Sequence, residues 1–488
     1  MTLTIVGLGP GAPEMLTRQA WDILSQSEIV YLRTNIHPTV AHLPASVELR
    51  SFDQVYEQVT DFAGVYTSIV DQIMTLLSTH DVVYAVPGDP FIAEGTVTLL
   101  MAACKSKNTA VEVIHGISFV EPTLRLLEID GITGLQLIDA LDIAAGHHPE
   151  INPDHGALIA QLFNQRVASD VKLTLMNQYP DDHAVNIVHG AGTPDQRVEK
   201  LLLYEIDRAS LSHLSTLYVP PLSPEAVSSF EGFQETIAHL RAPDGCPWDR
   251  EQTHLSLRSY LVEETYEVLD AIESENPDRL AEELGDLLLQ VVLHSQIAVD
   301  EGEFTLSQVI QRIDAKIKRR HPHVWGGVDV HNSASQVETN WETIKAQERH
   351  DNEPERKGLL DGVPPSMPAL ALAYEYDRRA ARVGFDWPNL DGVIAKIHEE
   401  LNEVLSAKTP DEQSCELGDL LLSVAVLSRW MTVAPEDALR AACQRFHERF
   451  SIVERQAKSQ GKPFSEMTAD ELDALWNEAK RQTRDKQK

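Results

Sequence analysis

The chain has 488 residues, a formal net charge of -34 and a pI near 4.9. This length suggests roughly two to four domains, because a typical domain has about 100 to 200 residues. The acidity argues against a general affinity for nucleic acid backbones or anionic membrane surfaces, since such affinity needs clustered Lys and Arg side chains. A phosphorylated ligand would therefore need metal ions or a few well-placed basic residues beside it.

The cysteines and the first residues of the chain indicate the cellular compartment in which the protein works. The four cysteines are widely spaced and form no CxxC pair: Cys104, Cys246, Cys415 and Cys443. This pattern favours reduced thiols over a disulfide frame or a zinc site. No apolar run approaches the roughly 20 residues that a membrane span needs, and Met1–Gly7 begins a strand rather than a signal peptide. We expect a soluble, cytoplasmic protein without a membrane partner.

The first 220 residues alternate short β-branched runs with longer amphipathic segments, which is typical of an α/β fold. The runs that we expect to form strands are Leu3–Val6, Val82–Val86, Val111–Ile114 and Leu173–Met176. After the Pro-rich stretch Val219–Pro224 the strand signal disappears. Helical periodicity takes over, including Leu255–Ile272 and Arg279–Ala298. We therefore place a domain boundary near residue 222.

The first strand runs into a glycine-rich turn, Ile5–Gly11. A lone turn of this kind is weak evidence, because glycines also serve ordinary tight turns. Pro10 and Pro13 interrupt it, which argues against a dinucleotide-binding fingerprint. Gly9 and Gly11 would still let the backbone approach a ligand closely.

Two further turns come after strands, Tyr84–Pro90 and His115–Ser118. Together with Ile5–Gly11 they resemble the tetrapyrrole methylase family, over about residues 1 to 220. The resemblance implies two α/β lobes with S-adenosylmethionine bound in the cleft between them. The residues that it places at the cofactor are Gly9, Pro10, Gly11, Pro87, Gly88, Asp89, Pro90 and Ser118. Methyl transfer mainly requires alignment and exclusion of water, so the methyl acceptor cannot be read from the sequence.

The helical half contains two acidic sets of one design, EExxE followed by ExxD. The first set is Glu263, Glu264, Glu267, Glu283 and Asp286, and the second is Glu399, Glu400, Glu403, Glu416 and Asp419. Carboxylates at positions i and i+3 share one face of a helix. Four converging oxygen donors suit Mg²⁺ better than Zn²⁺, because no His or Cys accompanies them at ligand spacing. The alternative is a solvated acidic helix face, which is common in so acidic a chain.

The repeat extends beyond the acids to a basic pair one helical turn apart and a Trp four residues before a Lys. The first copy has Lys316, Arg320, Trp341 and Lys345, and the second has Arg445, Arg449, Trp476 and Lys480. Tandem duplication of a helical unit is the simplest account, with a joint around Glu353–Pro368. The basic pairs could hold phosphate oxygens, and each Trp could pack against a base or in a core.

The first acidic set, with Cys246–Asp249, Gln252–His254 and Arg319–Val324, resembles the MazG family of nucleoside triphosphate pyrophosphohydrolases. Val383–Trp387 and the second set resemble the other half of two-copy members. The resemblance covers about residues 225 to 485. It implies helices from two subunits in one bundle, hence a homodimer, with Mg²⁺ held by four carboxylates. It also implies cleavage of nucleoside triphosphates to nucleoside monophosphate and pyrophosphate.

In such a reaction a carboxylate next to a metal ligand can orient or deprotonate the attacking water. Glu263 and Glu399 have that place in the two copies. The second copy departs from the family pattern at Glu412, Cys443 and Arg445. We therefore expect its nucleotide binding to differ more from the family than its metal binding.

The sequence thus predicts a multidomain protein. A two-lobed α/β methylase-like domain spans residues 1–222, and all-α helical-bundle MazG domains span 223–352 and 353–488. The predicted function is Mg²⁺-dependent hydrolysis of nucleoside triphosphates in nucleotide-pool housekeeping, fused to a methyltransferase-like domain. Two alternatives stay open: the amino-terminal domain is a non-catalytic S-adenosylmethionine sensor or assembly module, or the chain is mainly a tetrapyrrole methyltransferase with a degenerate helical appendage.

Overall fold

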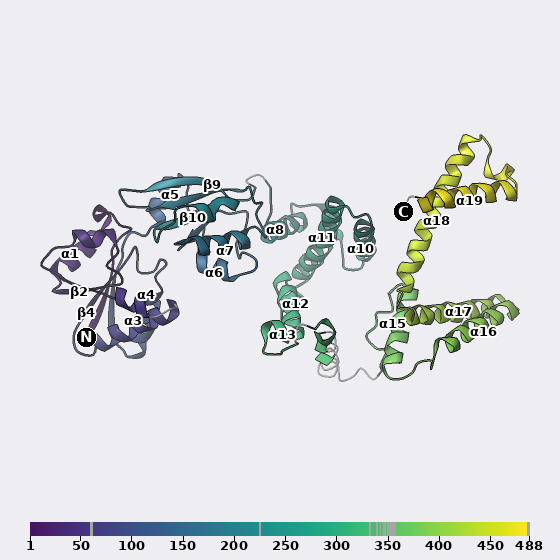
Figure 1. The fold of residues 1–488 in the computed structure, drawn as a ribbon, viewed down its shortest axis with the longest axis horizontal. Coiled ribbons are helices and arrows are strands. Elements are labelled where there is room, and N and C mark those ends of the chain that lie inside the picture. The colour runs from purple at the N-terminus through teal and green to yellow at the C-terminus, as the bar shows by residue number, and fades with distance from the viewer. Residues whose placement is uncertain are drawn as a thin grey trace. The chain divides into compact units, whose positions relative to one another are not determined.

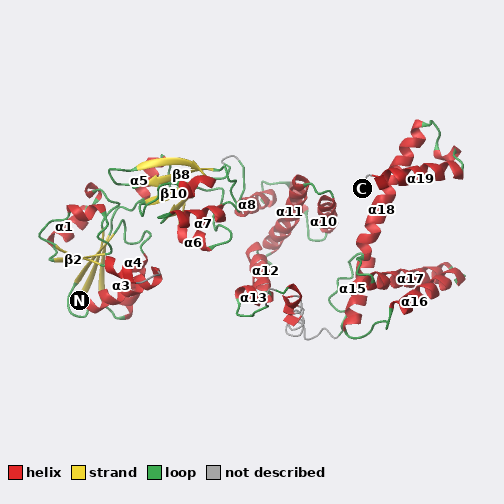
Figure 2. Cartoon of the chain, viewed as in Figure 1, coloured by secondary structure: helices red, strands yellow, loops and turns green. Residues whose placement is uncertain are grey.

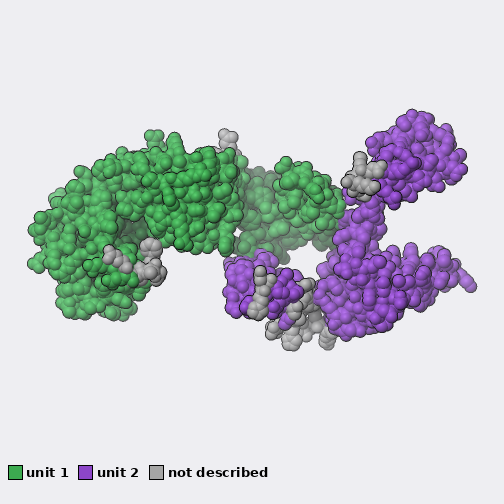
Figure 3. Space-filling model, in the orientation of Figure 1, with its two compact units in different colours: residues 1–310 green, residues 311–488 purple. Residues whose placement is uncertain are grey.

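The computed structural model describes residues 1–58, 62–223, 226–330, 333–337, 340–341, 343–344, 348 and 358–485. The chain divides into two compact units, residues 1–310 and 311–488 (Figure 3). Strands occur only before residue 220 in the described part of the chain, and helices dominate the described residues after it (Figure 2). The predicted order of an α/β region and an all-helical region is confirmed. The domain boundaries at 222 and 352 remain predictions.

The first lobe, which contains the amino terminus in Figure 1, is built on a parallel sheet. Its strand order is β3-β2-β4-β1-β5. Its strands are β1 (Thr2–Gly7), β2 (Ile29–Leu32), β3 (Glu48–Ser51), β4 (Val82–Val86) and β5 (Ala110–Ile114). Its helices are α1 (Arg18–Gln26), α2 (Asp53–Gln58), α3 (Phe62–Leu76) and α4 (Gly95–Ser106), with short 3-10 turns at Pro13–Met15 and Pro38–His42. Leu3, Ile5 and Val6 of β1 are fully buried, as expected for a parallel strand covered on both faces.

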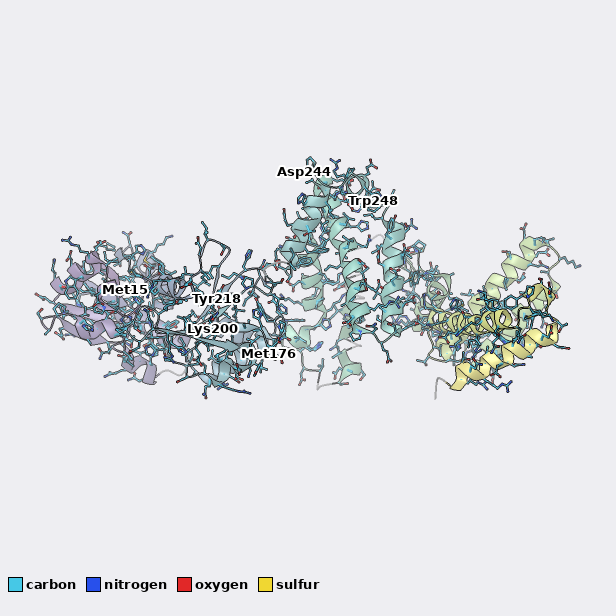
Figure 4. The ribbon with its side chains drawn as sticks, turned by 90° about the horizontal axis from the view of Figure 1, so that it is seen from above. Met15, Met176, Lys200, Tyr218, Asp244 and Trp248 are labelled. Carbon is cyan, nitrogen blue, oxygen red and sulfur yellow. The ribbon has the colours of Figure 1, made fainter. Side chains whose placement is uncertain are left out.

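The second lobe is a mixed sheet with strand order β6-β7-β10-β8-β9, in which only β6 and β7 pair in parallel. Its strands are β6 (Gln136–Asp139), β7 (Ala157–Ala160), β8 (Ala184–His189), β9 (Arg197–Leu202) and β10 (Ser215–Val219). The helical segments are α5 (Val120–Leu127), α6 (Ala140–Ala145), α7 (Gln165–Leu175) and the 3-10 helix Leu203–Arg208. In Figure 4, Met15 marks the first lobe and Tyr218 the second.

The strand predicted at Leu173–Met176 is wrong, because these residues complete α7 and its C-cap. The side chain of Asn164 caps the helix by accepting a hydrogen bond from the Val167 backbone N–H at 2.9 Å. Val167, Val171 and Leu175 are buried at four-residue spacing. The four β-branched and apolar residues were therefore the last turn of an amphipathic helix whose start lies upstream.

The helices of the first unit that come after the lobes pack around a small core of their own. They are α8 (Phe230–Arg241), α9 (Pro247–Glu251), α10 (Arg258–Glu273) and α11 (Pro277–Glu301). Ile237, Val292 and Ile297 are buried in this core. The α10–α11 hairpin confirms both predicted helices, and Asn276 caps α11 by accepting from two backbone N–H groups. The next helix, α12 (Leu306–Arg320), crosses the boundary between the two units.

Asp154 connects the second lobe to the start of α8 through hydrogen bonds. Its carboxylate accepts hydrogen bonds from the backbone N–H of Ser228 at 2.7 Å and of Ser229 at 3.1 Å, and from the Ser229 hydroxyl. Partial burial would raise the pKa of Asp154, but these hydrogen bonds outweigh it and lower the pKa. The junction is thus built on a carboxylate that is ionised at neutral pH.

The second unit repeats the hairpin arrangement. After α13 (Pro322–Trp325) its helices are α15 (Ala369–Arg382), α16 (Leu390–Ser406), α17 (Pro410–Trp430), α18 (Pro435–Ser459) and α19 (Ala469–Asp485), with a 3-10 turn at Phe464–Glu466. Helices α16 and α17 form one hairpin, and α18 and α19 form another (Figure 1). Val453, Ala457 and Ala479 are buried between α18 and α19. The predicted joint Glu353–Pro368 lies outside the described residues up to residue 357.

No single helix of the described residues is both long enough and apolar enough to cross a membrane. Helices α17 and α18 meet the length and composition criteria only as a pair, which is bent by 104° at its break.

Candidate active sites

The first acidic cluster lies where α10 packs on α11. Glu264, Glu267 and Glu283 each bring an oxygen to within 4.8 Å of the others. Asp286 lies outside this tight group, but its negative charge reaches Glu264 and helps to raise the pKa of that side chain. The structure therefore gathers all four predicted metal ligands, three closely and Asp286 at the edge.

Mutual repulsion characterises this first cluster. Burial is the largest cause of the raised pKa of Glu264, followed by the charge of Asp286 and the proximity of Glu267. Arg279 lies 3.5 Å from Glu283, measured from its Nε to Oε1. Carboxylates that repel one another in this way are stabilised by a bound cation. The all-oxygen donor set fits Mg²⁺.

The second cluster lies in the equivalent place between α16 and α17. Glu400, Glu416 and Asp419 bring oxygens to within 4.8 Å of one another. The pKa of Glu403 is raised by burial and by the charges of Glu400 and Glu416, so the fourth predicted ligand is also close. Glu400 is only 4% exposed, and its buried Oε2 has no hydrogen-bond partner. A buried carboxylate oxygen without a partner is the kind of atom that a metal ion would satisfy.

Lys396 distinguishes the second cluster from the first. Its ammonium lies 2.9 Å from Glu399 Oε1 and 2.8 Å from Glu400 Oε1. Hydrogen bonds to Glu400 and Glu399 raise the pKa of Lys396. One lysine thus joins the predicted catalytic Glu399 to a predicted metal ligand. In the first copy the corresponding position, three residues before Glu263, holds Tyr260.

Glu412 has a local structural role. With Thr409 it forms a capping box at the start of α17, in which the Glu412 carboxylate accepts from the backbone N–H of Lys408 and of Thr409. These two hydrogen bonds lower the pKa of Glu412. The departure from the family pattern at this position is therefore explained by helix capping.

The basic residues of the first copy belong to a different unit from its acidic cluster. Arg320 lies 5.9 Å from the ring centre of Trp341 and 2.6 Å from Glu348, measured between its Nη2 and Oε2. Lys316 is one turn earlier on α12. The structure therefore brings Arg320 and Trp341 together, and Lys345 lies outside the described residues.

The basic residues of the second copy gather on the α18–α19 hairpin. Lys480 lies 5.9 Å from the ring centre of Trp476, and Arg449 Nε donates to Thr483 Oγ1 at 3.2 Å. Arg445 is one turn before Arg449 on α18. The acidic cluster lies on the other hairpin, so a site shared by the carboxylates and the basic pair remains a prediction.

The three glycine-rich loops of the amino-terminal domain meet at the carboxyl ends of β1, β4 and β5. Gly9 and Gly88 exchange backbone hydrogen bonds of 3.2 and 2.8 Å. Gly116 packs so closely that a Cβ there would lie 2.2 Å from the Gly88 carbonyl oxygen. Loops at this end of a parallel sheet form a ligand crevice in many α/β folds.

A cavity of about 510 Å³ opens beside these loops, and Pro10, Pro87 and Gly88 are part of its lining. Asp89 instead joins two of the loops, whereas Ser118 makes a local contact at the start of α5. Asp89 accepts from the His115 ring at 2.9 Å and from the Gly116 N–H at 3.3 Å, while the Ser118 hydroxyl donates to Glu121 at 2.6 Å. The remaining predicted cofactor residues, Gly9, Gly11 and Pro90, lie in the same loops.

The sequence reasoning missed much of the cavity wall. Arg33, His37 and Glu94 line it from the first lobe, and Ala191 lines it from the second. Ala191 belongs to the loop Gly190–Thr193, where a Cβ on Gly192 would lie 2.4 Å from Pro10 Cγ. This Gly-Ala-Gly-Thr turn after a β-branched run was a readable signal, whereas nothing in the sequence marks Arg33 or Glu94.

Comparison with known proteins identifies both halves. The model of the tetrapyrrole (corrin/porphyrin) methylases matches residues 2–207, and that of the MazG nucleotide pyrophosphohydrolase domain matches residues 252–325. The uncharacterized protein YabN of Bacillus subtilis is 41% identical over 486 residues, 98% of each chain. The chain belongs to the YabN family of methylase–MazG fusions. The family models confirm the predicted fold class of both halves.

Other relatives match one half each. The MazG nucleoside triphosphate pyrophosphohydrolase/pyrophosphatase of Thermotoga maritima is 45% identical over 256 residues, covering 52% of this chain and 97% of that protein. The nucleoside triphosphate pyrophosphohydrolase of Escherichia coli K12 is 41% identical over 256 residues, covering 50% and 95%. A uroporphyrin-III C-methyltransferase structure from Thermus thermophilus is 20% identical, covering 45% of this chain and 94% of that one, with a TM-score of 0.37.

Proposed function

We propose that the chain hydrolyses nucleoside triphosphates to nucleoside monophosphate and pyrophosphate with Mg²⁺, at the two acidic clusters. The observation that carries this proposal is the convergence of three carboxylates in each hairpin, with a buried, unpartnered oxygen on Glu400. The MazG relatives, which are named as pyrophosphohydrolases, support the reaction type.

The residues of each cluster have separable tasks. Glu264, Glu267, Glu283 and Asp286, and Glu400, Glu403, Glu416 and Asp419 in the second copy, would hold Mg²⁺. When bound, the ion offsets the charge of the phosphates and lowers the pKa of water. Glu263 or Glu399 accepts a proton from the water as its oxygen bonds to the α-phosphorus. The bond from the α-phosphorus to the bridging oxygen breaks, and pyrophosphate leaves.

The same hairpins support a dimer. On α11 the exposed side chains Leu284, Leu288 and Val291 follow helical spacing and form one apolar stripe. On α17 Leu417 and Leu421 do the same. We expect each stripe to pack against a hairpin of a second subunit in a four-helix bundle. Light scattering of the purified chain measures this directly, and a monomer at micromolar concentration would contradict it.

The amino-terminal domain is proposed to bind S-adenosylmethionine. The support is the meeting of three loops at the strand ends beside a cavity, together with the match to the methylase family model. Calorimetry with S-adenosylhomocysteine tests this part separately from hydrolysis.

A panel of nucleoside triphosphates and deoxynucleoside triphosphates, with identification of both products, tests the hydrolase proposal. The variants are Glu264→Gln, Glu400→Gln and their combination. Glu282→Gln is the matched control, because Glu282 is exposed on α11 beside Glu283 and lies outside the cluster. Loss of activity in the double variant is expected, by roughly 100-fold. Undiminished hydrolysis in the double variant would overturn the assignment.

A further inference from the structure

The cavity between the two lobes has a lining without net formal charge, which bears on the ligand that it can take. Arg33 and Glu94 are its charged residues among the described residues that line it. Their side chains are 9% and 7% exposed, and Arg33 Nε lies 3.2 Å from Glu94 Oε1. Glu94 therefore neutralises the positive charge of Arg33 in the absence of a ligand.

The contacts of this ion pair also hold both side chains in place. Arg33 lies 4.7 Å from the ring centre of Tyr56 and 5.0 Å from that of Tyr66. Glu94 further accepts from the N–H and the hydroxyl of Thr96, at 3.1 and 2.6 Å, and so caps α4. Withdrawing Arg33 toward a ligand carboxylate would leave Glu94 as a buried charge without its partner, which is costly.

The rest of the wall is largely apolar and aromatic. Ile92, Phe119, Phe163 and Leu214 face the cavity along with the two tyrosines. S-adenosylmethionine brings its own ammonium group with its single carboxylate, whereas a ligand with several carboxylates would lose their hydration here without gaining cations from the wall. A polycarboxylate such as a uroporphyrin is thus a poor match for the cavity, whereas an uncharged aromatic molecule matches it.

His37 adds a side chain that can form a hydrogen bond to a ligand in this cavity. The residue is 6% exposed, lines the cavity, and its ring hydrogen-bonds to the backbone of Gly9. Burial is the main cause that lowers the pKa of His37 to about 4, so the ring is neutral at pH 7. The buried Nδ1 has no partner. In a neutral imidazole that donates its only N–H, the other nitrogen is an acceptor, and a buried acceptor without a donor is costly.

We propose that the cavity takes, beside S-adenosylmethionine, a small uncharged aromatic molecule whose N–H or O–H donates to Nδ1 of His37, and that it excludes polycarboxylate tetrapyrroles. The inference rests on the proposed cofactor site, because the cavity adjoins the same loops.

The test uses the full chain with S-adenosylhomocysteine present and four probes followed by ligand-observed NMR. Indole is the uncharged donor, 1-methylindole lacks the N–H, indole-5-carboxylate adds a charge, and uroporphyrin III is the polycarboxylate. We expect indole to bind roughly tenfold tighter than 1-methylindole, since one buried hydrogen bond is at stake. We expect indole-5-carboxylate to bind more weakly than indole, and uroporphyrin III not to displace indole.

The variant His37→Phe should bind indole and 1-methylindole alike. His42→Phe is the matched control, because His42 is an exposed residue of the same segment. Equal binding of the two indoles by the wild-type chain, no binding of indole at millimolar concentration, or displacement of indole by uroporphyrin III would each overturn the inference. If S-adenosylhomocysteine fails to bind while the indole preference persists, the cofactor proposal is lost and the assignment of the cavity stands.

Discussion

The two acidic clusters have the same pattern of carboxylates but different cations beside them. In the first, Arg279 lies 3.5 Å from Glu283, and Glu264 carries a raised pKa. In the second, Lys396 contacts both Glu399 and Glu400, at 2.9 and 2.8 Å. Two clusters with the same acidic pattern can thus differ in how their charge is neutralised without metal. The first cluster should depend more on Mg²⁺ for its stability than the second.

The largest expected effect is the stabilisation of the whole chain by Mg²⁺. A ligand that binds only the folded state at about 100 times its dissociation constant stabilises it by about 2.7 kcal/mol. Thermal unfolding in EDTA and in Mg²⁺ measures the difference. We expect the gain to fall in Glu264→Gln and in Glu400→Gln, and more in Glu264→Gln. An equal gain in wild type and the double variant would contradict both metal sites.

Removal of Lys396 should make the second cluster resemble the first. In Lys396→Met the buried Glu400 loses its partner, so unfolding in EDTA should occur a few degrees lower. Mg²⁺ should restore most of this loss, because the freed carboxylates bind it more readily. Lys408→Met is the control, since Lys408 is an exposed lysine in the loop between α16 and α17. A loss that Mg²⁺ cannot restore would show that Lys396 acts through packing instead.

The converse change, Tyr260→Lys, places an ammonium four residues before Glu264. It should raise the unfolding temperature in EDTA slightly, by analogy with helical i,i+4 pairs of about 0.3–0.5 kcal/mol, and reduce the gain from Mg²⁺. Tyr260→Met controls for the lost contact with Trp248, whose ring centre lies 6.2 Å away. If both variants respond to Mg²⁺ alike, charge at this position does not distinguish the two copies.

The smallest expected effect is on how the stability of the fold depends on pH in the absence of metal. The folded-state pKa of Glu264 is raised above its ordinary value, chiefly by burial and by Asp286. Its protonated form therefore stabilises the fold below the ordinary Glu pKa, and this contribution is lost as pH rises through the raised value. Unfolding in EDTA should show this decline in wild type and not in Glu264→Gln. A decline that persists in Mg²⁺ would place its origin in another group.

Much of each acidic cluster could be predicted from the sequence, because it depends on the spacing of residues along one helix. Carboxylates at i,i+3 lie on one helix face wherever the helix is placed, so Glu264 and Glu267 could be paired without a structure. Two local features were readable and missed: Lys396, three and four residues before its partners, and the capping box of Glu412. The strand predicted at Leu173–Met176 failed because four residues do not distinguish a strand from the end of a helix.

By itself, the sequence determined the α/β and helical halves, the glycine loops and the acidic pairs, since each depends on spacing along one element or on a single turn. Only the tertiary structure decided the cavity. Arg33 and Glu94 are 61 residues apart and meet because β2 and the loop before α4 end at one edge of the sheet. The neutrality of His37 depends on burial. Pairing between segments far apart in the sequence, and the burial of a residue outside a periodic element, leave no periodic trace, so both are decided by packing.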